Sequence, residues 1–193
     1  MEERLKLLIK SLGEERFKHN EDLINHTFSK SKGSAQLFYI ATTQQELVKI
    51  LDLASELQIP CFVFGSGTKL LINSKLRGLV VKNRSGGVKV AGVKGKIIKE
   101  GLGVEEAFIE ADSGVSLGKL NEFVKKEKLK EIDGFSSLHA TVGGAIFLDP
   151  LLRNATQSLK VWSEGEVLDI KLLELKRDHI VLSVIFKFKA QGE

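Results

Sequence analysis

Two short glycine-containing segments carry residue types that can hold a phosphorylated ligand. The first, GSGTKL at positions 65–70, directly follows the apolar run CFVF at 61–64. Glycine lets a backbone approach a ligand closely, and successive N–H groups in such a turn can surround an anion. Ser66 and Thr68 add hydroxyl groups, and Lys69 adds a positive charge. The segment therefore predicts a loop that binds a diphosphate.

The second segment, TVGGA, occupies positions 141–145. Thr141 can donate a hydrogen bond to a phosphate oxygen, and Gly143 and Gly144 leave no side chain between the backbone and a ligand. A valine at position 143 is expected to block the ligand and to leave the fold largely intact. Two such loops in different halves of a chain would enclose a phosphate-bearing cofactor between them, where ligand sites are common.

Each loop alone is weak evidence, because a glycine turn at the end of a strand often has no function. The first loop lacks the G-x-x-x-x-G-K-[ST] spacing of a P-loop. It also lacks the G-x-G-x-x-G pattern of dinucleotide-binding folds, since Leu70 stands where the third glycine would be. The two loops together are the informative feature.

The first half of the chain predicts a helix followed by a βαβ unit. Residues 1–17 have an amphipathic helical pattern. A strand at 37–42, a helix at 42–59 and a strand at 61–65 follow, and the last is apolar enough to be buried on both faces. A further strand is predicted at 78–83. Such a strand–helix–strand order makes a right-handed crossover.

The second half predicts a mostly antiparallel sheet, interrupted by one helix at 116–129 that Ser116 caps. Its alternating, β-branched strands are expected at 88–93, 95–103, 105–114, 159–165, 166–175 and 179–189. The fold class is therefore α+β with two subdomains. The expected division is an N-terminal helix at 1–19, a βαβ subdomain at 20–84 and an antiparallel subdomain at 85–193.

The composition is that of a soluble globular protein. The 193 residues are 42% hydrophobic and 28% charged, with a net charge of +4, which does not indicate nucleic-acid binding. No stretch is long and apolar enough for a membrane span, and the N-terminus does not resemble a signal peptide. The single cysteine, Cys61, fits a buried structural thiol in a cytoplasmic protein. No pattern suggests a metal site.

Several segments, in this order, resemble the UDP-N-acetylenolpyruvoylglucosamine reductases, also called UDP-N-acetylmuramate dehydrogenases. The similar segments are HTFSKSKGSAQLFYIATTQQEL (26–47), IPCFVFGSGTKLLI (59–72), RGLVVKN (77–83), IEADSGVSLGKLNEFVKKEKL (109–129), GFSSLHATVGGAIFLD (134–149) and HIVLSVIFKF (179–188). Members of that family are FAD enzymes of peptidoglycan synthesis. Their flavin domain has the two-subdomain fold of the vanillyl-alcohol oxidase and p-cresol methylhydroxylase type.

The resemblance implies that FAD lies between the two subdomains and that NADPH is a possible electron donor. It assigns the pyrophosphate to the first loop, through Gly65, Ser66, Gly67, Thr68, Lys69 and Leu70. It assigns the flavin and its phosphates to Thr141, Gly143, Gly144 and Ala145, with Ser137 nearby. Ile180, in the last strand, would offer backbone contacts to the adenine.

This chain departs from the family pattern at several positions. GSGTK replaces the usual GGGSN, and SLHAT replaces GIPGT, so that His139 stands where a proline is usual. A Tyr-Arg pair expected before the last strand is missing, and Arg177 is the nearest arginine. His139 and Arg177 are the candidates for a catalytic role. The family's substrate domain, which supplies a serine acid and a glutamate, is expected to be missing from this chain.

Three functions remain open from the sequence. The favoured one is a flavin-binding module without a complete substrate site. The second is an active NADPH-dependent reductase of a UDP-sugar, completed by a second protein chain. The third is a non-flavin protein that uses the same fold for structure or interaction.

Overall fold

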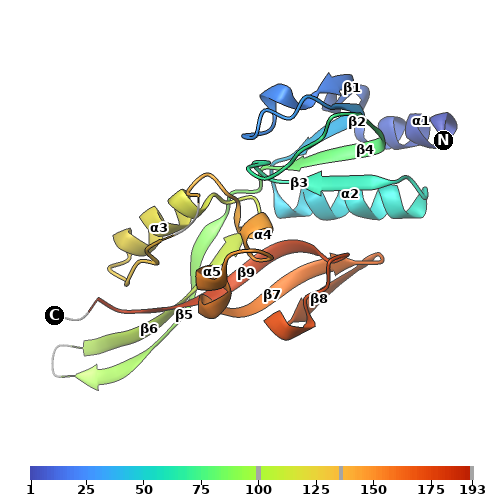
Figure 1. Ribbon diagram of the computed structural model, residues 1–193. Helices are drawn as coiled ribbons and strands as arrows, with labels where there is room; N and C mark the ends of the chain where they lie inside the picture. Colours follow the sequence, from blue (N-terminus) through green and yellow to red (C-terminus); the bar gives the residue numbers. More distant parts are fainter. Residues whose placement is uncertain (99–100, 135–136, 192–193) are drawn as a thin grey trace.

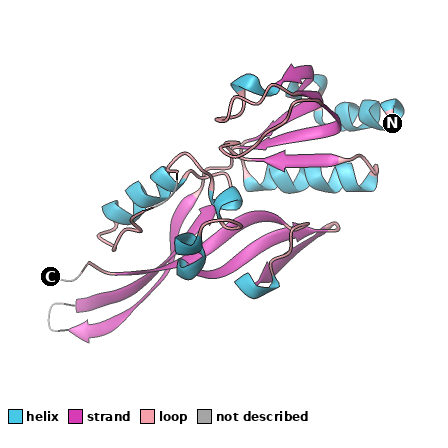
Figure 2. Ribbon diagram, viewed as in Figure 1, coloured by secondary structure: helices cyan, strands magenta, loops and turns pink. Residues whose placement is uncertain are grey.

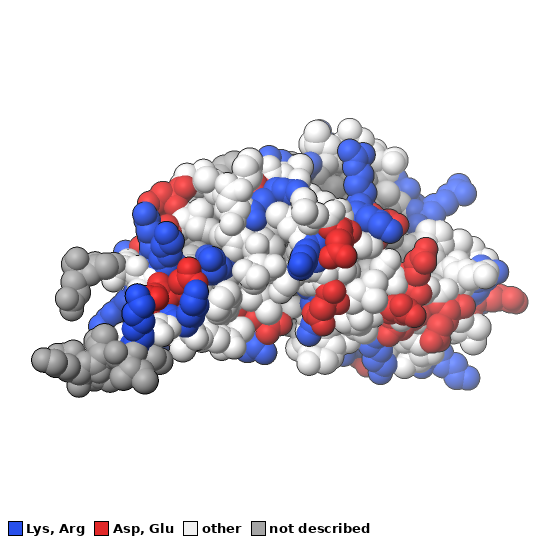
Figure 3. Space-filling view, turned by 90° about the horizontal axis from the view of Figure 1, so that it is seen from below, with Lys and Arg blue, Asp and Glu red and all other residues white. Residues whose placement is uncertain are grey.

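The computed structural model describes residues 1–98, 101–134 and 137–191, which form two sheets with helices between and beside them (Figure 1). Figure 2 shows helices and strands in both halves, and the two longest helices, Glu2–Leu12 and Gln44–Glu56, lie in the first half. No helix in the described ranges is long and apolar enough to cross a membrane. Acidic and basic side chains lie side by side over much of the face in Figure 3.

The first half is a four-stranded sheet in the order β1-β2-β4-β3. Its elements are α1 (Glu2–Leu12), β1 (Phe17–Asp22), β2 (Ser34–Ala41), α2 (Gln44–Glu56), β3 (Cys61–Phe64) and β4 (Lys75–Asn83). β2 and β3 both pair in parallel with β4, and β1 pairs antiparallel with β2. The predicted βαβ unit is present, with β4 inserted between its two strands. β1 was not predicted.

β3 is only partly buried, contrary to the expectation from its apolar sequence. Phe62 is 37% exposed, and Cys61 is half-buried. β3 is the last strand of the sheet, so that one of its edges has no neighbouring strand. An apolar run indicates a strand but does not tell whether that strand is central or at an edge.

α2 begins at Gln44, two residues after the expected start, because the Thr43 hydroxyl caps it by accepting a hydrogen bond from the N–H of Glu46 at 3.1 Å. The Glu46 carboxylate accepts from the backbone N–H and the hydroxyl of Thr42 and pairs with Arg16, each at 2.7 Å. Partial burial opposes ionisation of this carboxyl, but these donors outweigh it and lower its pKa to about 2.

The second half is a five-stranded antiparallel sheet in the order β5-β6-β9-β7-β8. Its elements are β5 (Val88–Ile98), β6 (Gly101–Asp112), α3 (Leu117–Lys126), α4 (Val142–Ala145), α5 (Pro150–Ala155), β7 (Thr156–Ser163), β8 (Glu166–Ile170) and β9 (Ile180–Lys189). The predicted helix is α3, and Ser116 caps it by accepting from the N–H of Lys119 at 3.2 Å. α4 and α5 were not predicted.

Two expected strand boundaries in this half are wrong. The separate strands expected at 88–93 and 95–103 are one strand, β5, as far as Ile98, and residues 101–103 begin β6, while residues 99–100 lie outside the described residues. Irregular pairing at Val90/Gly92 and Lys94/Gly95 lets β5 stay paired with β6. The strand expected at 166–175 ends at Ile170, and a 3-10 turn, Leu172–Glu174, follows.

The two halves pack together through α2, which lies between the first sheet and β9 (Figure 1). Leu47 and Ile50 of α2 share one hydrophobic cluster with Leu182 of β9. At the same junction the indole N–H of Trp162 donates to the Asp52 carboxylate at 2.6 Å. One apolar cluster of the first half thus reaches β9 of the second half, which also has a core cluster of its own.

Replacing Asp52 by alanine should lower the free energy of unfolding by about 1–2 kcal/mol, because the half-buried indole N–H loses a charged acceptor. Asp52→Asn keeps an acceptor oxygen and should lose less. Urea unfolding followed by circular dichroism measures both variants. Equal stability of Asp52→Ala and wild type would show that the bond contributes nothing.

The lowered pKa of Glu46 predicts a stability that depends on pH. A carboxyl whose pKa is lowered by folding stabilises the protein fully above its ordinary pKa, and this contribution disappears as the pH falls toward about 2. Glu46→Gln should therefore be less stable than wild type at pH 7, and the difference should shrink at pH 3. A difference that is unchanged between the two pH values would contradict the ion-pair role.

Candidate functional site

Three connected hollows lie between the two halves, and both Gly65 and Thr141 line all three. The inner hollow, about 450 Å³, is bounded by β3, Phe147 and the start of β9. The loop hollow, about 220 Å³, lies over the first glycine loop. The basic hollow, about 410 Å³, lies at the end of β4 and reaches His139. The two glycine loops thus come together at Gly65 and Thr141, as the sequence predicts.

The first glycine loop has backbone N–H groups free to bind a ligand. Its Ser66 and Gly67 carbonyl oxygens accept from the N–H groups of Phe28 and Ser29, at 2.8 and 3.1 Å. The N–H groups of residues 66–69 donate to no backbone carbonyl among the described residues. Gly67 has a φ of 65°, a conformation that favours glycine. Consecutive free N–H groups of this kind form an anion-binding concavity.

The second loop uses its N–H groups within the protein. Gly143 donates to the Ser113 carbonyl, and Ala145 donates to the Thr141 carbonyl, both at 2.8 Å. This loop therefore offers a flat surface and the Thr141 hydroxyl rather than a row of donors. A Cβ at Gly65 would collide with the side chain of Thr141, so the close approach of the two loops requires glycine at position 65.

The two glycines of the second loop face different surroundings, which corrects the expectation for position 143. A Cβ on Gly143 would lie 2.8 Å from the Cβ of Ser113 at the floor of the inner hollow, so a valine there would strain the fold and not leave it largely intact. A Cβ on Gly144 would meet only the Thr141 hydroxyl oxygen, at 3.7 Å, and Gly144 lines both the inner and the loop hollows. A side chain at 144 would thus enter the cleft without the collision that a side chain at 143 makes with Ser113.

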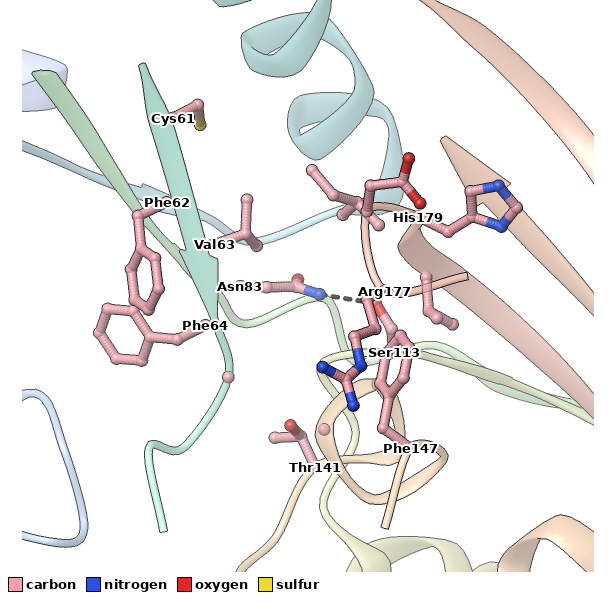
Figure 4. Close-up of a pocket in the computed structure, with 16 residues that line it drawn as sticks. Cys61, Phe62, Val63, Phe64, Asn83, Ser113, Thr141, Phe147, Arg177 and His179 are labelled. Carbon is pink, nitrogen blue, oxygen red and sulfur yellow. Dashed lines mark hydrogen bonds between the residues drawn. The ribbon is translucent and has the colours of Figure 1, made fainter. Parts of the chain in front are cut away.

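The floor of the inner hollow is a polar contact that the sequence analysis missed. Asn83, the last residue of β4, donates from its amide to the Ser113 hydroxyl at 2.7 Å (Figure 4). Both residues are buried, and Asn83 also accepts from the N–H of Ser85. The available signal was a polar residue at the end of β4 and another immediately after β6. The bond joins the two sheets directly below the cleft.

The inner hollow has mainly apolar walls, including Phe62, Phe147 and Ile180. Arg177 enters it from the segment before β9 and points toward Thr141 and Phe147 (Figure 4). Cys61 also borders this space, but burial raises the pKa of its thiol to about 12, so that the thiol stays protonated at neutral pH.

The two candidate catalytic residues lie in different hollows. His139 borders the basic hollow and stacks on Phe28, with ring centroids 4.6 Å apart and an angle of 23° between the planes. Arg177 borders only the inner hollow.

Of the predicted cofactor-binding residues, Ser137 alone lines none of the three hollows, and the others border at least one. The basic residues Lys82 and Arg84 were not predicted.

Sequence comparison relates this chain to FAD-binding proteins. A model of the FAD binding domain family matches residues 35–148. A UDP-N-acetylenolpyruvoylglucosamine reductase from Clostridium tetani is 27% identical over 93% of this chain and 60% of its own length. The corresponding reductase from Aquifex aeolicus is 31% identical over 69% of this chain and 41% of its own length. This chain thus spans roughly half the length of these relatives.

Solved structures share the fold at low sequence identity. An alkyldihydroxyacetonephosphate synthase has a TM-score of 0.70 at 18% identity, over 97% of this chain and 40% of its own. A UDP-N-acetylenolpyruvylglucosamine reductase from Thermus caldophilus has 0.67 at 18%, over 89% and 62%. A p-cresol methylhydroxylase has 0.60 at 12%, over 98% and 43%. These likenesses confirm the predicted α+β fold class and its two-subdomain type.

The different surroundings of the two adjacent glycines give a stability test. Gly143→Ala should lower the free energy of unfolding by about 1–3 kcal/mol, because its methyl group is forced against Ser113. Gly144→Ala should change it by much less, since its methyl group meets open space. Thermal unfolding of the two variants and wild type makes the comparison. A larger loss at 144 than at 143 would contradict the loop geometry.

Proposed function

Because this chain belongs to the FAD-binding domain family, we propose that it is a flavin module that binds FAD in the cleft between its two halves. The observation that carries the proposal is the row of free N–H groups at residues 66–69. Such a row fits the charge and the size of a diphosphate. Its position at the end of β3, beside a cleft with apolar walls, fits a diphosphate that carries two large rings.

In this proposal each loop has a separate task. The first loop would hold the pyrophosphate through the N–H groups of residues 66–69, with Lys69 as the nearby cation and Leu70 at the apolar side. The second loop would lie flat against the cofactor, through Gly144 and Ala145, while the Thr141 hydroxyl donates to it. Ile180, with Phe62 and Phe147, would enclose one of the two rings in the inner hollow.

FAD, when bound, supplies oxidation–reduction chemistry that no side chain of a protein can perform. The chain's own residues would bind and orient it and exclude water from it. The buried Asn83–Ser113 bond would keep the floor of the cleft in place. His139 lines the basic hollow together with Ser66 and Thr141 and would lie close to the cofactor.

The complete reductase reaction is a second proposal, favoured by the names of the similar proteins. It would require NADPH as the electron donor, a UDP-sugar substrate, and acidic groups from outside the described residues, for instance from a second chain. NADPH-dependent loss of the flavin absorbance, measured with and without the enolpyruvyl sugar nucleotide, would test this reaction.

The flavin proposal is tested by adding FAD to the purified protein, removing unbound FAD by desalting, and recording the visible spectrum. Wild type should retain a flavin band. Gly144→Val should lose it or weaken FAD binding at least tenfold, because the side chain enters the inner and loop hollows. Circular dichroism should show that the variant is folded.

A matched control is Gly92→Val, in β5, where a Cβ meets only a Phe108 ring carbon at 3.8 Å, far from the loops. This variant should bind FAD as wild type does. A folded wild-type protein that retains no flavin would refute the proposal and favour a structural or interaction role. Full FAD binding by Gly144→Val would refute the assignment of the second loop.

A further inference from the structure

We infer that the basic hollow is a second anion site, which takes the phosphate or carboxylate of the molecule that reacts with the flavin. The inference rests on the proposed FAD site and extends it to the reaction partner. It is carried by the charges around the hollow, by the environment of one lysine, and by the position of the hollow relative to the first glycine loop.

The hollow is lined by three cations and by no carboxylate among the described residues. The cations are Lys30, Lys82 and Arg84, and none of them forms an ion pair with a described residue. The other two hollows differ, since Asp178 borders the inner one and Asp149 borders the loop hollow. Cationic side chains without an ion-pair partner among the described residues are therefore concentrated at the basic hollow.

Lys82 is the strongest sign of a binding site. Its side chain is half-buried, and its ammonium group donates to the neutral carbonyl oxygen of His26 at 2.7 Å. Burial, and then the charge of Arg84, lower the pKa of Lys82. The fold thus holds a partly desolvated cation close to a second cation, an arrangement that a bound anion would stabilise.

The hollow lies apart from the place proposed for the FAD diphosphate. All of residues 66–69 line the loop hollow, whereas only Ser66 of these lines the basic hollow. The Ser66 and Gly67 carbonyl oxygens are bonded to the 28–29 segment, which borders the basic hollow at Phe28. The stacked Phe28 and His139 rings join the two halves at this hollow. An anion held there would be next to the cofactor without replacing its phosphates.

Both kinds of partner considered for this protein carry such a group. A nicotinamide dinucleotide carries phosphates, and an enolpyruvyl sugar carries a carboxylate. The chemistry shared by the two is an oxyanion that accepts hydrogen bonds from ammonium and guanidinium groups. Inorganic phosphate and acetate can therefore serve as probes, and their relative effects distinguish the two sources.

The test measures the melting temperature of the FAD-free and the FAD-saturated protein as phosphate or acetate is added, with potassium chloride keeping the ionic strength constant. A ligand that binds only the folded state raises the melting temperature, and saturating phosphate should raise it by about 3 °C in both forms. A larger effect of phosphate than of acetate would favour a phosphate-bearing partner, and the reverse a carboxylate.

The double variant Lys82→Gln/Arg84→Gln should lose the increase in melting temperature that phosphate causes, and it should keep the wild-type Kd for FAD. Lys49→Gln, at an exposed position of α2, removes a charge elsewhere and should keep both properties. If the double variant does not fold, Arg84→Gln alone, with its exposed side chain, should lose most of the increase.

Three results would overturn the inference. The first is that neither anion raises the melting temperature, and the second is that the increase persists in the variants. The third is evidence that the cations hold the cofactor's own phosphates, given either by FAD binding that is at least tenfold weaker in the double variant or by loss of the phosphate effect in the FAD-saturated protein. A wild-type protein that binds no FAD would refute the proposed function instead, and the FAD-free measurements would still test the anion site.

Discussion

The structure depends on a contact between two residues from different halves, Gly65 and Thr141. The absence of a side chain at Gly65 lets the end of β3 touch the start of α4, and this point borders every hollow of the cleft. A larger residue at position 65 would collide with the Thr141 side chain. The packing of α2 against both sheets and the Asn83–Ser113 bond serve to keep this contact in register.

The charges of the cleft are divided between its parts. The first loop offers neutral N–H dipoles and one exposed lysine, while three cations, Lys30, Lys82 and Arg84, line the basic hollow. Dipoles from a fixed backbone can bind an anion without the cost of desolvating a cation, and so they suit a permanently bound group. Lysine and arginine side chains suit a ligand that arrives and leaves, because they also attract it from a distance.

Much of the fold could be predicted from the sequence, because local signals determine it. Thr43 and Ser116 mark the starts of α2 and α3, and the apolar runs mark β2, β3 and β4. The edge position of β3 could not be predicted, since the order of strands depends on distant pairing. The continuity of β5 was missed because irregular pairing near Gly92 and Gly95 tolerates residues that usually mark turns.

The candidate site was predictable in part for the same reason. Its two glycine loops are local patterns, and the structure brings them together. A side chain at position 143 would collide with Ser113, which lies thirty positions earlier in the chain. No local sequence pattern contains both residues. The basic hollow likewise combines Phe28, Lys82 and His139 from three separate segments. Only the topology of the whole chain places these residues side by side.

Trp162 gives the molecule an optical property. It is the only tryptophan of the chain, and it lies opposite Ile180 in the pairing of β7 with β9. Ile180 borders the inner hollow, so the indole emission of this protein arises from a single position one strand away from the cleft. The chain therefore carries an intrinsic energy donor beside the place where a yellow chromophore would act as the acceptor.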